Sequence, residues 1–236
     1  DYEVFSRRFG LDREANFEGW RWHLHVFRSE EDIAGELQLD VAEVEKRLNR
    51  ARAALLEVRN RRVWPGRDEK VLTSWNGLTI SGMAVAARAL ERADLADAAG
   101  RAVDFIRTTC WRDGRLLATY KDGRARFSAY LDDHAFLLDG LLELLQTRWR
   151  SEDLQFATDL ANTLLAHFED REHGGFYFTA DDHEQLMHRS RSFADEAVPA
   201  GNAIAAQALT KLGLMLGETR YLDAAAKTIR AAWPAL

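Results

Sequence analysis

The sequence predicts an all-α protein built as an incomplete α/α toroid of helical hairpins, with short β-hairpin insertions. Its composition favours helices, because the 236 residues include only three prolines, the residue that a helix interior tolerates least. Helices that are apolar on nearly every side alternate with amphipathic ones, as expected for an inner and an outer ring. The alternation recurs loosely three times, and repeated helical hairpins form solenoids or closed rings. Only about seven long helices fit the chain, so the ring stays incomplete.

The segment before the repeats is predicted to hold a turn, a short strand and two helices. A turn and then alternating polar and apolar residues occupy 16–26, which indicates a strand. Ser29 and Asp32 have the spacing of a capping box and predict the start of a short helix. Asp40 is the expected N-cap of a longer amphipathic helix that ends near Asn60.

We expect one domain over 1–236, with an irregular or strand-containing lead-in at 1–29, outer helices at 30–62 and three helical-hairpin repeats at 63–236. In chain order, the repeats are predicted to contain an inner helix at 73–92, an outer helix at 94–110, a two-strand segment at 114–127 with a hairpin turn at Lys121-Asp122-Gly123, an inner helix at 131–147, an outer helix at 151–169, a short strand at 174–182, an inner helix at 200–216 and an outer helix from 219 to the end.

Polar residues occupy equivalent places near the starts of the three inner helices: Asn76, Asp133 and Asn202. In a ring of hairpins these helix ends converge on a central hollow, where pockets form in helical assemblies. The first turn of a helix also leaves backbone donors unsatisfied. The sequence therefore predicts a binding pocket at the N-terminal ends of the inner helices.

The stretch 63–90 joins a charged loop to the first inner helix, which Thr73 or Ser74 is expected to cap. Around the start of this helix, five side chains offer charges, hydrogen-bonding groups and an aromatic face: Arg67, Asp68, Lys70, Trp75 and Asn76. A helix cap beside an ordinary salt-bridged loop is the alternative interpretation of the same residues.

The bulk composition excludes several classes of function. A formal net charge of −6 and a pI of about 5.7 lack the basic surplus that nucleic-acid binding requires. No apolar run approaches the ~20 residues of a membrane span. A single cysteine excludes an internal disulfide framework, and we expect a cytoplasmic protein. The chain opens without a signal peptide or an initiator methionine, so we expect it to be part of a longer protein.

The histidines of the lead-in do not form a convincing metal site. His23 and His25 lie on one face of the predicted strand, but no cysteine, third histidine or nearby carboxylate completes a ligand set. We therefore expect no metal, and no other cofactor.

Five stretches, in order along the chain, resemble a known family. They are NFEG at 16–19, GRDEKVLTSWNGL at 66–78, LDDHAFLLDG at 131–140, GGFYFTADD at 174–182 and DEAVPAGN at 195–202. The set is similar to the thioredoxin-domain-containing family of the spermatogenesis-associated thioredoxin-like proteins, which join an N-terminal thioredoxin-like domain to a six-hairpin-glycosidase-like toroid. The resemblance covers the toroid part only.

This chain departs from the pattern of that family at three positions. His134 stands where the family usually has tyrosine, and Glu196 and Ala200 replace the usual glycine and serine. The thioredoxin-like part and its cysteine pair lie outside this chain, so the resemblance implies no redox function for these residues. Cys110 is expected to pack on an outer helix.

The resemblance implies carbohydrate metabolism, because toroids of this kind have relatives among glycoside hydrolases and among sugar epimerases and isomerases. Hydrolysis needs two carboxyl groups that flank a glycosidic bond. We expect Asp133 and Asp195 to form this pair, with Asp68 as a third candidate. N-caps and loop-fixing salt bridges are the alternative roles for these carboxyl groups.

An epimerase or isomerase needs instead a base that titrates near pH 7, and His134 is the candidate if an aspartate orients its ring. Trp75 is expected to stack on a sugar face, although a tryptophan at a helix start is also a common core residue. The remaining polar candidates, expected to bind sugar hydroxyls, are Arg67, Lys70, Asn76 and Asn202.

A function of another class competes with the enzyme. The chain could be a non-catalytic module that binds a protein or a ligand and positions the thioredoxin-like domain. Since an incomplete ring leaves apolar helix faces uncovered, we also expect self-association or packing on that domain. The expected ligand is a small sugar, and we expect neither a nucleic-acid nor a membrane partner.

Overall fold

The structure, a computed structural model, describes residues 1–184 and 187–235. The chain divides into two compact units, Asp1–Asp68 and Glu69–Leu236. Each unit has a hydrophobic core made of its own buried side chains. The two units are therefore described separately.

The first unit is helical, with α1 (Tyr2–Phe9), α2 (Glu30–Leu37) and α3 (Val41–Asn60). The capping box predicted at the start of α2 is present, since the Ser29 hydroxyl accepts the N–H of Asp32 and the Asp32 carboxylate accepts the N–H of Ser29. Apolar side chains of all three helices form the small core: Val4, Phe5, Ile33, Ala34, Val44 and Leu48.

The strand expected within 16–26 is wrong. The segment closes on itself by a single bridge between Phe17 and Arg21, and Asn16 exchanges two hydrogen bonds with the backbone of His23. A positive φ of 76° at Gly19 permits the tight turn between the bridged residues. The alternating pattern therefore belongs to a compact loop, and His23 and His25 are exposed.

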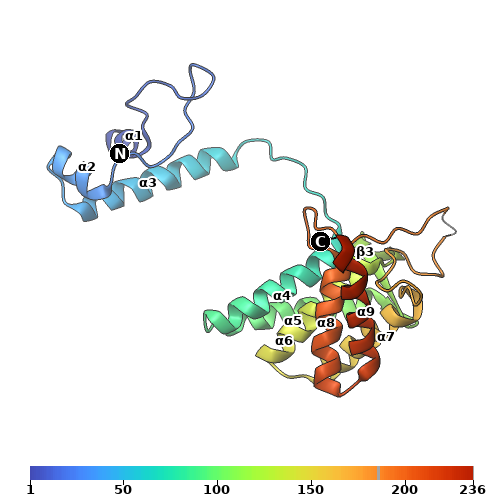
Figure 1. Ribbon diagram of the computed structural model, residues 1–236. Helices are drawn as coiled ribbons and strands as arrows, with labels where there is room; N and C mark the ends of the chain where they lie inside the picture. Colours follow the sequence, from blue (N-terminus) through green and yellow to red (C-terminus); the bar gives the residue numbers. More distant parts are fainter. Residues whose placement is uncertain (185–186, 236) are drawn as a thin grey trace. The chain divides into compact units, whose positions relative to one another are not determined.

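The second unit contains the hairpins predicted from the sequence (Figure 1). The inner helices are α4 (Thr73–Ala89), α6 (Leu131–Thr147) and α8 (Gly201–Leu216), and the outer helices are α5 (Ala93–Thr109), α7 (Ser151–His167) and α9 (Thr219–Ala232), followed by a short 3-10 turn at Trp233–Ala235. Each inner helix packs on the outer helix that follows it, and α6 packs between α4 and α8. This central position explains why α6 is buried along almost its whole length.

The backbones of α4 and α6 approach closely at two glycines. A Cβ atom on Gly77 would lie 2.5 Å from the backbone carbon of Phe136, and one on Gly140 would lie 2.7 Å from the carbonyl oxygen of Gly77. Larger residues at either position would push the two inner helices apart. The small residues in these otherwise apolar helices therefore set the distance between them.

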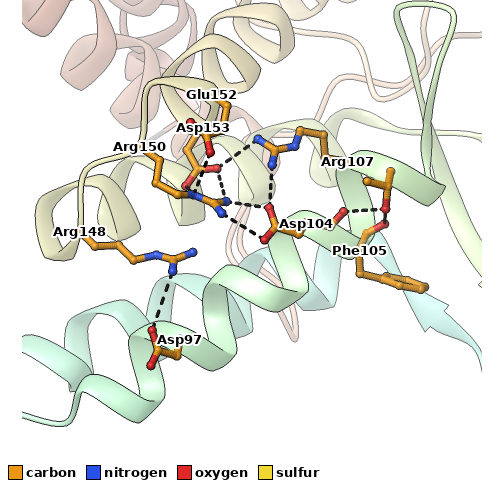
Figure 2. A network of polar contacts seen from close by, with 9 residues as sticks. Asp97, Asp104, Phe105, Arg107, Arg148, Arg150, Glu152 and Asp153 are labelled. Atoms are coloured by element: carbon orange, nitrogen blue, oxygen red, sulfur yellow. Dashed lines mark hydrogen bonds and ion pairs between the residues drawn. The ribbon is translucent and has the colours of Figure 1, made fainter.

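A network of arginines and aspartates joins the outer helices α5 and α7 (Figure 2). Arg150 donates to Asp153 at 2.6 and 2.8 Å and to Asp104 at 2.8 and 3.1 Å. Arg107 also contacts both carboxylates, and the side chain of Asp153 is completely buried. Hydrogen bonding from Arg150, together with the charge of Arg107, keeps the pKa of Asp104 below its usual value. The network therefore joins α5 to the start of α7, near the C-terminal end of the inner helix α6.

A small antiparallel sheet covers the start of α4. Its strand β3 (Arg115–Lys121) pairs with the three other strands, β1 (Val71–Leu72), β2 (Trp111–Arg112) and β4 (Arg124–Ser128). Asp122 and Gly123 both have a positive φ, which is the geometry of the two-residue hairpin turn expected there. The second expected strand, at 174–182, is reduced to one bridge between Phe176 and Glu169.

The predicted fold class is confirmed: the second unit is part of an α/α toroid of helical hairpins with short β-hairpin insertions. None of the helices in the described part of the chain is both long and apolar enough to cross a bilayer.

Candidate functional site

Asp133 links the N-terminal ends of two inner helices. One carboxylate oxygen accepts the backbone N–H of Ser74 at 2.8 Å, and the other accepts the N–H of Tyr130 at 2.9 Å. The expected cap by Thr73 or Ser74 is therefore wrong: the Thr73 hydroxyl donates to the Leu117 carbonyl on β3 instead. Burial raises the pKa of Asp133 to about 6. Both oxygens of this candidate acid are thus engaged by backbone.

His134, the next residue in the chain, is buried in the core. Its Nδ1 atom is 2.9 Å from the Tyr130 carbonyl, which makes Nδ1 the protonated nitrogen. Its Nε2 atom is buried without a hydrogen-bond partner, and the ring packs on Phe168 at 4.9 Å. Burial lowers the pKa of His134 to about 4, so the ring is neutral at pH 7.

The two asparagines at the other helix starts bind backbone. Asn202 is fully buried, accepts the N–H of Phe176 at 2.7 Å, and donates to the carbonyls of Phe176 and Ser192 at 2.9 Å each. Asn76 donates to the Leu72 carbonyl at 2.8 Å. The three equivalent polar positions therefore share one structural role, which is to fix the chain that enters each inner helix.

A cavity of about 270 Å³ opens where α6 and α8 begin. It is lined by Leu131, Asp132, Phe178, Ser190, Ser192, Ala194, Glu196, Val198, Pro199, Ala200, Gly201 and Asn202. We call it the helix-mouth pocket. It combines two carboxyl groups, two hydroxyls, an amide and an aromatic ring.

Asp132 is the most unusual group of the helix-mouth pocket. Burial raises its pKa above the ordinary value for an aspartate. Its Oδ1 atom lies where a side chain on Gly201, the first residue of α8, would stand. The absence of a side chain at Gly201 therefore gives the carboxyl group room against the N-terminus of α8.

Phe178 supplies the aromatic wall of the same pocket. Its ring stacks on Tyr130 with centroids 4.9 Å apart and an interplanar angle of 15°, and its carbonyl accepts the N–H of Leu131. The ring remains 38% exposed. A flat, supported and accessible ring can stack on the apolar face of a sugar.

The remaining predicted residues lie elsewhere. Asp195 is exposed and accepts the N–H of Ala200 at 2.8 Å, which holds the entry to α8. Trp75 is 63% exposed at the first turn of α4, and Lys70 is exposed just before it. Arg67 and Asp68 are exposed residues of the first unit. Of the predicted site residues, Asn202 belongs to the lining of the helix-mouth pocket.

Five polar or aromatic residues of this lining are not among the predicted site residues: Asp132, Phe178, Ser190, Ser192 and Glu196. Asp132 and Glu196 are the chain neighbours of the predicted Asp133 and Asp195. The signal was therefore present in the motifs, but a one-residue difference in helical or loop position decides which carboxyl faces the cavity.

One cluster in the described part of the chain has the composition of a metal site: His167, Asp181 and Asp182 have ligand atoms within 4.8 Å of one another. All three members already have partners. His167 bonds Asp181 at 2.8 Å, and Arg115 binds both oxygens of Asp182. The cluster is therefore a His167–Asp181 hydrogen bond beside an ion pair between Arg115 and Asp182.

Comparison with solved structures defines the fold as that of sugar-processing α/α toroids. Cellobiose 2-epimerase from Bacillus thermoamylovorans superposes with a TM-score of 0.59 and 9% identity, over 70% of this chain and 45% of that one. Unsaturated glucuronyl hydrolase from Bacillus sp. GL1 superposes with a TM-score of 0.55 and 18% identity, over 72% of this chain and 49% of that one. An α-1,6-mannanase of Salegentibacter sp. superposes with a TM-score of 0.56 and 16% identity, over 75% of this chain and 50% of that one. That structure is an inactive variant, with two consecutive aspartates replaced by asparagine, in complex with mannotriose.

Homologues of this chain include spermatogenesis-associated protein 20 of several mammals, which confirms the family resemblance of the motifs. Human spermatogenesis-associated protein 20 is 31% identical over 211 residues, covering 85% of this chain and 27% of the relative. An uncharacterized protein of Caenorhabditis elegans is 28% identical over 217 residues, covering 89% and 30%. The chain thus spans less than a third of the length of these relatives. No protein-family model matches it.

Proposed function

We propose that the second unit carries a carbohydrate-active site in the helix-mouth pocket, with Asp132 as its acid. The observation that carries the proposal is the placement of Asp132: a half-buried carboxyl with a raised pKa that opens into a cavity at the ends of two inner helices. A general acid must hold a proton near neutral pH, and burial favours the protonated form.

Glu196 is the second carboxyl group of the proposed site. It lines the same cavity and is exposed to water, and we assign it the role of the second carboxyl group. Glycoside hydrolysis uses one protonated and one ionised carboxyl around the scissile bond. Phe178 then offers a stacking face, and Ser190 and Ser192 offer hydroxyls to the sugar.

Hydrolysis is better supported than a histidine-dependent epimerisation. His134 is 1% exposed, its pKa is lowered to about 4, and its Nδ1 proton is directed to the Tyr130 carbonyl. A base for proton abstraction next to a carbonyl must reach the substrate and titrate near pH 7. The choice is supported by the solved mannanase, whose variant with two consecutive aspartates replaced by asparagine is inactive, since this chain also has two consecutive aspartates, Asp132 and Asp133.

The test is hydrolysis of a panel of neutral disaccharides and nitrophenyl glycosides by the full chain and by two variants. We expect Asp132→Asn to lower the rate by about 10²- to 10⁴-fold, the usual contribution of a general acid. Asp97→Asn, at an exposed position on α5, is the matched control and should keep full activity. Absence of hydrolysis on every substrate, or full activity of Asp132→Asn, rules the proposal out.

A binding or scaffold role is the second candidate function. It is favoured by the exposed apolar side chains on α4, where Trp75 is 63% and Val85 46% exposed. Such residues on an inner helix of a partial ring fit a surface that meets another domain, including the thioredoxin-like domain that the relatives are expected to contain. Sugar binding without turnover, unchanged in Asp132→Asn, would favour this role.

A further inference from the structure

The described lining of the helix-mouth pocket is acidic. Among its members, Asp132 and Glu196 carry carboxyl groups, Ser190, Ser192 and Asn202 are polar and uncharged, and the others are apolar or glycine. This lining includes no lysine, arginine or histidine. A ligand in the pocket therefore meets two carboxyl groups, of which Asp132 is the proposed proton donor and Glu196 the one that carries negative charge, and no cation from this lining.

The nearest arginines along the chain face another cavity. Ser190 and Ser192 line the helix-mouth pocket, whereas Arg189 and Arg191, which alternate with them, line a second cavity of about 330 Å³. Successive side chains of an extended segment point to opposite sides, so one stretch of chain forms a wall of both cavities.

The two arginines are also held on their own side by hydrogen bonds. Arg189 donates to the carbonyls of Thr179 and His167 and lies 4.2 Å from the centre of the Tyr177 ring. Arg191 binds the buried carboxylate of Asp170 at 2.7 Å. These contacts fix both guanidinium groups away from the helix-mouth pocket.

We propose that the helix-mouth pocket selects its sugar by charge: it takes a sugar without an acidic group, binds an amino-substituted sugar most tightly, and rejects uronic acids. An acidic group on the ligand would lie near the negative charge of Glu196 with no cation of the lining to neutralise it, and an ammonium group would lie near a charge of opposite sign. This inference rests on the proposed function, because it names the substrate class of the same pocket.

The test measures dissociation constants of the full chain for methyl glycosides of a neutral hexose, its 2-amino derivative and its uronic acid, in gluco, manno and galacto configurations. At low ionic strength we expect the uronate to bind at least about tenfold more weakly than the neutral sugar, and the amino sugar more tightly than both. The differences should shrink in 0.5 M salt, which screens charges.

A charge-removing variant tests the source of the selection. Glu196→Gln should raise the affinity for the uronate relative to the neutral sugar by about threefold or more, and should weaken the preference for the amino sugar. Glu152→Gln, at an exposed position of α7, is the control and should leave both ratios unchanged.

The outcomes separate the two proposals. If the neutral sugar binds but the uronate binds equally well or better, selection by charge is overturned and the carbohydrate site stands. If no sugar of the panel binds, the carbohydrate site itself fails, and the charge selection fails with it.

Discussion

The carboxylate of Asp133 accepts the backbone N–H of Ser74 at 2.8 Å, although the two residues lie 59 positions apart in the sequence. Through this bond the second inner helix caps the first. Asp133 also accepts the N–H of Tyr130 and so caps its own helix. One buried side chain thus fixes the relative position of two helix ends beside the candidate site.

Asp133 and its neighbour His134 should have opposite effects on the pH dependence of stability. The folded pKa of Asp133 is about 6, above the value of the unfolded chain, so its contribution to the free energy of unfolding decreases as pH rises from about 4 to 6. The folded pKa of His134 is about 4, below that of the unfolded chain, so its contribution increases as pH rises from about 4 to 6.5.

Each of these two pKa shifts changes the free energy of unfolding by on the order of 3 kcal/mol across its pH range. In the wild-type chain the two changes have opposite signs and largely cancel. Urea unfolding of two variants at pH 4.5, 5.5 and 6.5 should separate them. Asp133→Asn should become more stable with rising pH, and His134→Phe should become less stable. Parallel slopes for the two variants would contradict this assignment.

Replacing the glycines at the contact between α4 and α6 by alanine should destabilise the fold. Gly77→Ala and Gly140→Ala each place a methyl group against the facing backbone, and we expect a loss of about 1–3 kcal/mol or more in the free energy of unfolding. Gly82→Ala is the matched control on the same helix, because nothing lies within 4 Å of its new Cβ. It should stabilise the chain by about 0.5–1 kcal/mol. Equal effects at Gly77 and Gly82 would argue against the close helix contact.

Removing the buried carboxylate of the α5–α7 network should be costly. Asp153→Ala deprives Arg150 and Arg107 of a fully buried partner, and we expect a loss of about 2–3 kcal/mol, at the lower end for buried pairs because both arginines are partly exposed. Asp97→Ala removes an exposed carboxylate 3.9 Å from Arg148 and should cost less than about 0.5 kcal/mol. Thermal unfolding of both variants gives the comparison.

We expect the chain to self-associate through the exposed side of α4. Trp75 and Val85 lie on this side and are 63% and 46% exposed, respectively. Sedimentation velocity over a range of concentrations should show reversible association that the Val85→Arg variant weakens. A sharp monomer peak for the wild-type chain at every concentration would contradict self-association through α4.

The helices of the second unit could be predicted from the sequence because their apolar patterns are long and regular. The predicted helix at 131–147 coincides with α6, and the hairpin turn at Asp122 and Gly123 has the expected geometry. The strands at 16–26 and 174–182 could not be predicted correctly, because alternation over a few residues also occurs in loops that close on themselves.

The candidate site could be located from the sequence more easily than its residues could be chosen. The motifs placed it at the starts of the inner helices, where the helix-mouth pocket lies. Whether Asp132 or Asp133 faces the cavity depends on the packing of α6 between its neighbours, which local sequence does not encode. The space that Gly201 leaves for Asp132 likewise depends on the meeting of two helices that are distant in the chain.

Arginines and serines alternate along 189–192, and the two kinds of side chain line different cavities. The charge of each cavity therefore depends on which residues of this segment face it. Insertion or loss of a single residue just before this stretch would exchange their orientations, turning Arg189 and Arg191 toward Asp132. The cavity would then hold two arginines beside its two carboxyl groups, so a relative that differs here by one residue should accept acidic ligands that this chain is proposed to reject.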